Sequence, residues 1–258
     1  MATGKLEYVR ELERGNRLPN FNWIVVRIDG WHFHRFSEVH QFDKPNDARA
    51  LNLMNSCAVS MLEKFPDIIF AYGDSDEYSF IWSEKTNFCE RQESQILSQS
   101  VSFFTSVYVM KWGEFFPTQE LTYPPAFDGR VICYPRVKLV RDYLKWRQAD
   151  CHVNNQFNTC FWTLVKSGKK KSEAQKYLAG TQTAEKNQLL REFGIDYGAL
   201  PAMFRKGSCV FRDKVEEGVK LDGGRKPGEE TCRRVRVDYC DIIGKEFWDQ
   251  HSEILVED

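Results

Sequence analysis

The hydrophobic and polar positions of this chain predict a regular series of strands and helices. Residues 23–28 are apolar and rich in β-branched side chains, which is typical of a strand, and residues 68–82 read as two strands joined by a tight acidic turn. A helix-start signal at 45–47 opens a helical apolar pattern that ends near Pro66, and a second such pattern covers about 91–112. A short strand follows at 131–134, so the order is β-α-β-β-α-β.

This order is that of the split βαβ, or ferredoxin-like, motif. A right-handed βαβ unit makes the first two strands parallel, and the hairpin returns the third strand antiparallel and beside the first. Asp29 ends the first strand, while Asp76 and Glu77 begin the third. We therefore expect these carboxylates to meet at one end of the sheet.

The chain after residue 135 has a more helical pattern. We predict helices at 137–149, 154–166, 172–179 and 184–193, strands near 208–215 and 232–239, and a charged, glycine-bearing loop at 216–230. The expected fold is α+β. A ferredoxin-type core over residues 1–135 precedes a helical and β-hairpin extension over 136–258, and the two form one integrated unit.

Composition narrows the class of protein. The chain has 258 residues, 42% hydrophobic and 28% charged, with a net charge of −1, as in soluble globular proteins. Contact with nucleic acid would therefore come from local basic clusters, which concentrate after residue 165. We find no apolar run of bilayer-spanning length and no apolar core of a secretory signal at the start. Eight scattered cysteines without a Cys-x-x-Cys pair indicate reduced thiols. We expect an intracellular protein, in the cytoplasm, with the nucleus and the mitochondrion as alternatives.

Two carboxylates carry the main chemical hypothesis. Asp29 or Asp76 alone would more often be an ordinary turn residue, but the predicted topology brings both together with Glu77. Oxygen ligands of this kind suit Mg²⁺, which binds through one or two carboxylates and substrate phosphates. Two such ions serve phosphoryl and nucleotidyl transfer. Asp74 is ambiguous, because it can also cap the turn.

Further residues offer weaker signals for nucleotide binding. Successive amides from Gly30 to His34 can form an anion nest for a triphosphate, although an ordinary turn is the alternative. Lys44 can reach a phosphate or remain solvated, and His34 can donate to phosphate or simply pack. The polar cluster at 146–155, expected between two helices, includes His152, while Asn154 or Asn155 can cap the next helix.

The chain resembles the tRNA-His guanylyltransferase family in blocks spread over nearly its whole length. These blocks are KLEYVR at 5–10, VVRIDGWHFHRF at 25–36, KPND at 44–47, AYGDSDEYSF at 71–80, FDGRV at 127–131, YLKWRQADCHVNN at 143–155, FRKGS at 204–208, CDIIG at 240–244 and FW at 247–248. A combination of this length is far more specific than a single glycine motif.

The resemblance implies a palm-like core and 3′-to-5′ nucleotide addition. ATP, or sometimes GTP, activates the 5′-monophosphate of tRNA-His as an adenylylated RNA. The 3′-hydroxyl of GTP then attacks and expels the nucleotide monophosphate, after which pyrophosphate is removed. The resemblance also implies a homotetramer and no membrane partner.

The resemblance assigns roles to individual residues. Two Mg²⁺ ions would lie on Asp29, the Gly30 carbonyl and Asp76, with Glu77 as a supporting acid. The remaining positions would contact nucleotide or RNA end: Trp31, His32, Phe33, His34, Lys44, Asp47, Ser75, His152 and Asn155. Trp31 and His32 stand where the family commonly has Arg-Asn, and Asp74 where the residue is often uncharged, which puts side-chain contacts near the nucleotide in question.

Three alternatives remain open from the sequence. One is a template-directed 3′-to-5′ RNA end-repair polymerase, and another is a palm-type nucleotide cyclase using the same acids without tRNA. The third is a non-catalytic RNA-binding protein, which gives no reason to gather acids beside a phosphate backbone.

Overall fold

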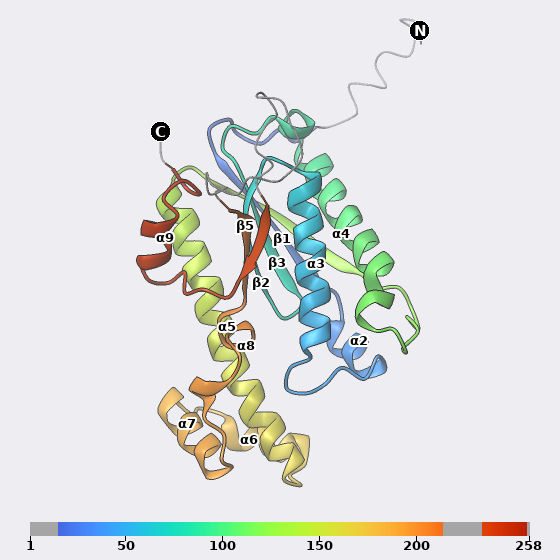
Figure 1. Ribbon diagram of the computed structural model, residues 1–258, viewed down its shortest axis with the longest axis vertical. Helices are drawn as coiled ribbons and strands as arrows, with labels where there is room; N and C mark the ends of the chain where they lie inside the picture. Colours follow the sequence, from blue (N-terminus) through green and yellow to red (C-terminus); the bar gives the residue numbers. More distant parts are fainter. Residues whose placement is uncertain (1–14, 214–233, 257–258) are drawn as a thin grey trace, which may run out of the picture.

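The computed structural model describes residues 15–213 and 234–256 and contains a six-stranded antiparallel sheet with helices on both faces (Figure 1). The strands are β1 Trp23–Gly30, β2 Ile68–Asp74, β3 Glu77–Trp82, β4 Phe127–Tyr134, β5 Ser208–Arg212 and β6 Val235–Asp238. The helices are α2 Phe33–Val39, α3 Ala48–Lys64, α4 Glu93–Phe115, α5 Val137–Lys166, α6 Lys171–Leu178, α7 Thr183–Glu192, α8 Ala202–Lys206 and α9 Glu246–Gln250, with short 3-10 turns at Phe88–Arg91 and Tyr197–Ala199.

The strand order is β4-β1-β3-β2-β5-β6. Its first four strands form the ferredoxin-like arrangement predicted from the sequence: β1 and β2 both pair antiparallel with β3, so they run parallel to each other. β5 pairs with β2, and β6 pairs with β5. The α+β prediction is confirmed, and the C-terminal hairpin extends the same sheet.

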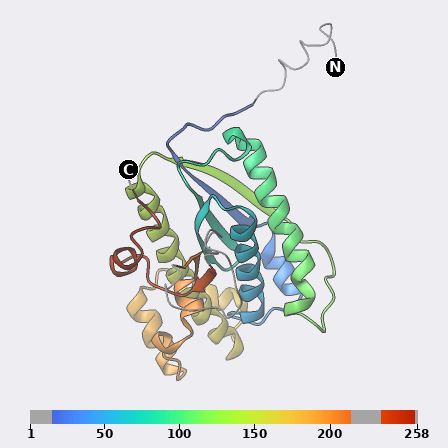
Figure 2. The same ribbon diagram turned by 45° about the horizontal axis from the view of Figure 1, so that its top comes forward.

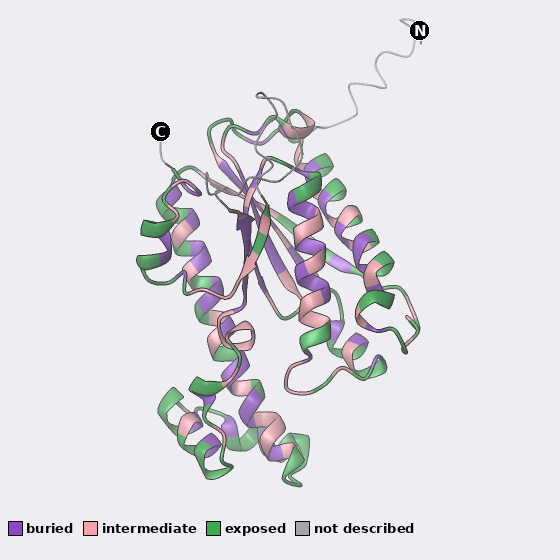
Figure 3. Ribbon diagram, in the orientation of Figure 1, coloured by how far each residue is buried: buried purple, intermediate pink, exposed green. Residues whose placement is uncertain are grey.

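Alternation along the strands divides the core into two layers. Ile24, Val26 and Ile28 of β1 face the layer under α3 and α4, whereas Trp23 and Val25 face the layer under α5 and α9. Figure 2 shows α3 and α4 side by side on one face and α5 on the other. Figure 3 shows the buried residues of these helices on the sides turned toward the sheet. Because side chains of successive residues point to opposite faces, each strand supplies both layers.

The predicted break in the helical region after residue 149 is wrong. α5 runs without interruption for 30 residues, so the polar cluster at 146–155 lies inside one helix rather than between two. Asn155 therefore caps no helix; it is buried on α5 and hydrogen-bonded across to Asn46. The C-terminal half of α5 carries α6 and α7, which close a small third core (Figure 1).

Other predicted elements differ in extent. The segment after Gly30 is more than an ordinary turn, because α2 begins at Phe33. The helix start at 45–47 is confirmed, because Asp47 caps α3 by accepting from the Arg49 amide. β4 begins four residues earlier than predicted, at Phe127. The predicted loop 216–230 lies outside the described residues. None of the described helices combines the length and apolar character of a membrane span.

Candidate nucleotidyl-transfer site

Four acids gather at one end of the sheet, as the topology predicts for three of them. Asp29 of β1 lies opposite Glu77 of β3, and Asp74 of β2 lies opposite Glu77 on its other side. The connecting turn consists of Ser75 and Asp76, and Ser75 has a positive φ of 55°. The hairpin turn thus places Asp76 directly beside the end of β1.

A hydrogen bond from Gly30 joins this turn to the end of β1. Its amide donates to the Asp76 carbonyl oxygen at 3.0 Å. A Cβ built at Gly30 would lie 2.4 Å from ring carbons of Phe33 and 2.8 Å from Oδ2 of Asp76. The absence of a side chain at Gly30 therefore allows the Asp76 carboxylate to approach the backbone closely.

Burial of Asp76 and its proximity to Asp29 favour the binding of a cation at this pair. Burial and then the charge of Asp29 raise the pKa of Asp76 to about 6. The Asp29 side chain is 38% exposed, so the pair is open to a ligand. Because the amide and carbonyl of one strand residue point to the same side, the Gly30 carbonyl also faces the Asp76 turn.

The donor set fits a hard divalent cation. Within the described ranges, no three His, Cys, Asp or Glu side chains form a metal cluster. If two carboxylates and one carbonyl bind the ion, its other coordination positions are open to water or substrate phosphate, which is how Mg²⁺ is commonly held. The residues present therefore suit Mg²⁺ and not a structural zinc ion.

Glu77 is engaged by two arginines rather than free for a ligand. Arg147 of α5 donates through Nε at 2.6 Å and through Nη2 at 3.0 Å to its two carboxylate oxygens. Arg27 of β1 lies 3.5 Å from Oε2 of Glu77 and 3.6 Å from Oδ2 of Asp29. Burial raises the pKa of Glu77, while the charges of Arg147 and Arg27 oppose that shift. The sequence analysis gave neither arginine a role. Arg27 could have been found, because side chains two residues apart on a strand point to the same face, which places Arg27 beside Asp29.

Asp74 belongs to the α5 face and does not cap the turn. Burial raises its pKa to about 6, although a hydrogen bond with the Cys151 thiol and the charge of Arg147 act in the opposite direction. Asp74 thus adds a further carboxyl group behind the Asp29–Asp76 pair.

Fewer backbone amides are available for an anion than the five predicted from Gly30 to His34. The Gly30 and Trp31 amides already donate to Asp76 and Ala126. His32 adopts a left-handed conformation with φ of 56° at the start of α2, and in the described part of the chain the amides of residues 32–34 donate to no acceptor. The Trp31 side chain is 62% exposed beside the acids, whereas the Phe33 ring is buried against Phe127.

The loop before α3 carries two predicted residues, of which Lys44 lies near Asp76, and α5 holds this loop in place. Lys44 donates to Ser37 at 2.7 Å; burial lowers its pKa, and the charges of Glu38 and Asp76 oppose that shift. Asp47 accepts from Arg49 at 2.6 Å, which makes it part of the loop's internal structure. Asn155 donates to Asn46 at 2.7 Å, so α5 holds this loop in place.

His152 lies further along α5. Its ring packs edge-on against Tyr197 at 5.4 Å between centroids, and burial and then the charge of Arg205 lower its pKa. Among the described residues, no hydrogen bond or ion pair joins His152 to Asp29 or Asp76. The structure thus brings Asp29, Gly30, Ser75, Asp76 and Glu77 together and leaves His152 apart from them.

Two family models match the chain. One, described as tRNAHis guanylyltransferase, matches residues 6–135, and one described as Thg1 C terminal domain matches residues 138–244. Among curated proteins, the chain is 58% identical over 255 residues to "tRNA(His) guanylyltransferase 2" of Arabidopsis thaliana, and 47% identical over 268 residues to "Probable tRNA(His) guanylyltransferase" of Mus musculus. It covers 90% of the mouse protein but about half the length of two Arabidopsis relatives, 48% and 44%.

Solved structures similar to this chain come from the same family of proteins. The chain is similar to the crystal structure of the tRNA(His) guanylyltransferase of Saccharomyces cerevisiae, with a TM-score of 0.76 and 45% identity over 80% of this chain and 92% of that one. A bacterial Thg1-like protein in complex with ATP has the same fold, with a TM-score of 0.71 at 22% identity over 97% of each chain.

Proposed function

Because the chain belongs to the tRNA(His) guanylyltransferase family, we propose that it is a nucleotidyltransferase that adds guanosine to the 5′ end of tRNA-His. ATP activates the RNA: an oxygen of the 5′-monophosphate attacks the α-phosphorus and pyrophosphate leaves. The 3′-hydroxyl of GTP then attacks the activated 5′ phosphorus, and AMP leaves. Relatives of 46–58% identity carry the name of this activity.

The observation that carries the proposal is the meeting of Asp29 and Asp76 at Gly30. Phosphoryl-group chemistry needs little covalent help from protein groups and depends on positioning and charge stabilisation. The Asp76 carboxylate, whose pKa is raised by burial and by the charge of Asp29, lies beside backbone amides without acceptors and provides that environment. An RNA-binding surface without catalysis would gain nothing from these negative charges.

We further propose that Asp29, Asp76 and the Gly30 carbonyl hold Mg²⁺. Bound divalent ions neutralise charge that develops on phosphate oxygens and orient the attacking and leaving groups. Arg147 and Arg27 hold the Glu77 carboxylate in place, and through it they hold the first residue of β3 beside Asp76. Glu77 is thus a positioning residue in this account.

The nucleotide contacts are assigned by the same reasoning. The amides of His32, Phe33 and His34 and the Ser75 hydroxyl would meet the triphosphate, and Trp31 offers an exposed ring where the family commonly has arginine. Lys44 would approach the phosphates from the loop before α3. Asp47 and Asn155 would act by fixing that loop, and His152 would contact the RNA end.

The test supplies 5′-labelled monophosphorylated tRNA-His that lacks the extra guanosine, with Mg²⁺, ATP and GTP. An adenylylated intermediate followed by extension by one guanosine supports the proposal. Absence of both, from a folded preparation, contradicts it. Two parallel reactions address the alternatives: a 5′-truncated RNA with a pairing template tests repair polymerisation, and ATP or GTP alone tests for a cyclic product.

The proposed assembly rests on the resemblance, and the proposed location rests on the eight scattered cysteines. We propose a homotetramer that acts on tRNA inside the cell, in the cytoplasm, with a catalytic core over 1–135 and an extension over 136–258. Light scattering of the purified chain measures the assembly, and a monomer at micromolar concentration would contradict the tetramer.

A further inference from the structure

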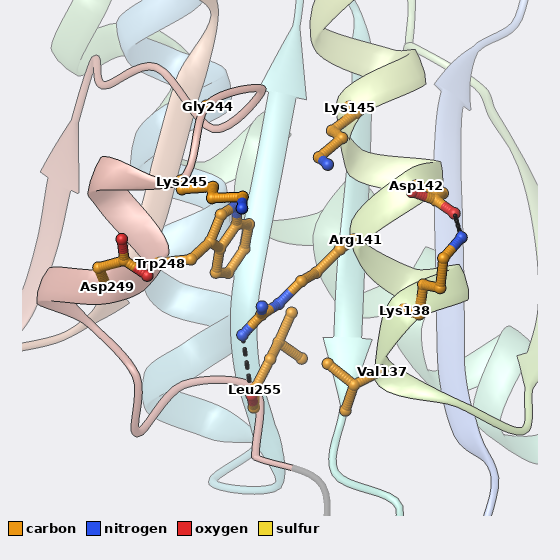
Figure 4. Close-up of a pocket in the computed structure, with 10 residues that line it drawn as sticks. All are labelled: Val137, Lys138, Arg141, Asp142, Lys145, Gly244, Lys245, Trp248, Asp249 and Leu255. Atoms are coloured by element: carbon orange, nitrogen blue, oxygen red, sulfur yellow. Dashed lines mark hydrogen bonds and ion pairs between the residues drawn. The ribbon is translucent and has the colours of Figure 1, made fainter.

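A hollow lies on the α5 side of the sheet, away from the acids. It has a volume of about 500 Å³ and lies between the first turns of α5 and the segment that enters α9 (Figure 4). None of the acids at the end of the sheet lines it. Arg141, on its wall, precedes Arg147 by six residues, which is about 9 Å along a helix.

The walls of this hollow are fixed by buried hydrogen bonds. Gln148 of α5 accepts from the Ile242 amide at 2.7 Å and donates to the Cys240 carbonyl at 3.0 Å. The indole of Trp248 donates to the Ile242 carbonyl at 2.9 Å. These bonds hold the segment before α9 against α5, so the side chains of the hollow stand on a preformed frame.

Positive charge predominates in the hollow. Lys138 forms an exposed ion pair with Asp142 at 2.8 Å, and the hydrogen bond from Lys138, and then the charges of Lys138 and Lys145, lower the pKa of Asp142. Lys145 from α5 and Lys245 from the facing segment both turn toward the gap in Figure 4, and in the described part of the chain neither forms an ion pair.

Arg141 adds a third cation. Its guanidinium stacks 5.3 Å from the centre of the Trp248 ring and donates to the Leu255 carbonyl at 3.4 Å. Its buried Nε has no hydrogen-bond partner among the described residues. The remaining acid, Asp249, is separated from Arg141 by the Trp248 ring in Figure 4.

We propose that this hollow binds a phosphate group through Arg141, Lys145 and Lys245. A guanidinium with one long hydrogen bond, at 3.4 Å, and two lysine ammonium groups that face the same hollow suit a multiply charged oxyanion. A volume of this size admits a nucleotide polyphosphate or a stretch of RNA backbone. Both ligands present phosphate groups, and the experiment below distinguishes a free polyphosphate from the RNA backbone. The site stands apart from the acids, so the binding does not depend on the proposed activity.

The test measures binding by the full chain in EDTA, without turnover. Calorimetry with inorganic tripolyphosphate compares the wild type with Lys145→Gln/Lys245→Gln and with Lys138→Gln, a matched control from the same wall whose charge is already paired. Lys245→Gln alone, at an exposed position, serves if the double variant does not fold. Fluorescence anisotropy with labelled tRNA is run on the same proteins over a range of salt concentrations.

The proposal predicts a loss of tripolyphosphate affinity of about tenfold or more in the double variant and little change in the control. If tRNA affinity falls as well, and each lysine removed lowers the slope of log affinity against log salt by about one, the phosphate belongs to RNA. If tRNA affinity is unchanged, it belongs to a free polyphosphate. Equal tripolyphosphate affinity in all proteins, or an equal loss in the control, overturns the proposal.

Discussion

Arg147 of α5 donates two hydrogen bonds, at 2.6 and 3.0 Å, to the two carboxylate oxygens of Glu77 at the start of β3. This pair fastens the longest helix to the strand that begins beside Asp76. It is largely shielded from water, because the two side chains are only 9% and 15% exposed. The site's acidic turn therefore depends on a cation 70 residues further along the chain.

Removing that cation should destabilise the protein. Arg147→Ala leaves the Glu77 carboxylate buried with only Arg27 nearby, and we expect a loss of about 2–4 kcal/mol in the free energy of unfolding. Urea denaturation measures it. Arg147→Met combined with Glu77→Gln, which leaves no unpaired carboxylate, should lose less than Arg147→Ala. A double variant less stable than Arg147→Ala would show that the pair does not act as described.

Gly30 should tolerate no side chain. In Gly30→Ala the new methyl group overlaps the Phe33 ring and Oδ2 of Asp76, so we expect about 1–3 kcal/mol of destabilisation and a larger relative loss of guanosine addition. Gly113→Ala is the matched control: a Cβ there meets nothing within 4 Å, and alanine in a helix should stabilise by about 0.5–1 kcal/mol. Thermal melts and the 5′-extension assay give both readouts. Full activity in Gly30→Ala would be inconsistent with the close approach of Asp76.

The raised pKa of Asp76 predicts a pH dependence in metal-free buffer. Its folded pKa of about 6 exceeds its ordinary value of 3.8, so the native state binds more protons than the unfolded state between these values. The free energy of unfolding should therefore fall as pH rises from about 4 to 6. Asp76→Asn should reduce this decline. Chemical denaturation in EDTA at several pH values checks it, and an identical slope in wild type and variant would refute the assignment.

Gln148 should stabilise the C-terminal segment. Its side chain accepts from two backbone amides, of Ile242 and Ile243, and donates to two carbonyls. Gln148→Ala leaves the Ile242 amide and the Cys240 carbonyl without this partner, whereas the Ile243 amide keeps Asp241 and the Lys206 carbonyl keeps Tyr72. We expect a loss of about 2–4 kcal/mol in the free energy of unfolding. Hydrogen exchange at the Ile242 amide should accelerate in the variant. Unchanged protection would mean that Gln148 does not hold this segment.

The sequence predicted the part of the fold that depends on local pattern and on strand connections. The order β-α-β-β-α-β is enough to bring Asp29 beside Asp76, because the handedness of the βαβ unit leaves few other arrangements. The hairpin at 68–82 and the Asp47 cap could also be predicted, because the residues that form a turn or a helix cap are close together in the sequence.

What the sequence did not reveal depends on partners far along the chain. The polar cluster at 146–155 indicated a break between two helices, yet two of its members, Gln148 and Asn155, are buried in α5. Gln148 is bonded to residues 240–243, and Asn155 is bonded to Asn46. Polar side chains satisfied in this way need not end a helix. Arg147 resembles any helical surface arginine until Glu77 is known to face it. The division of function between 1–135 and 136–258 stays a prediction.

The most direct test of the account is guanosine addition by Asp29→Asn and Asp76→Asn. Both substitutions keep side-chain size and remove the charge that would hold Mg²⁺, and Asp128→Asn, an exposed acid opposite Asp29 on β4, is the matched control. With 5′-monophosphorylated tRNA-His, ATP, GTP and Mg²⁺, we expect a rate loss of about a thousandfold in each of the two variants, about 4 kcal/mol in the barrier, and near wild-type rates in the control. Folded Asp29→Asn and Asp76→Asn proteins with rates within a few-fold of wild type would contradict the account.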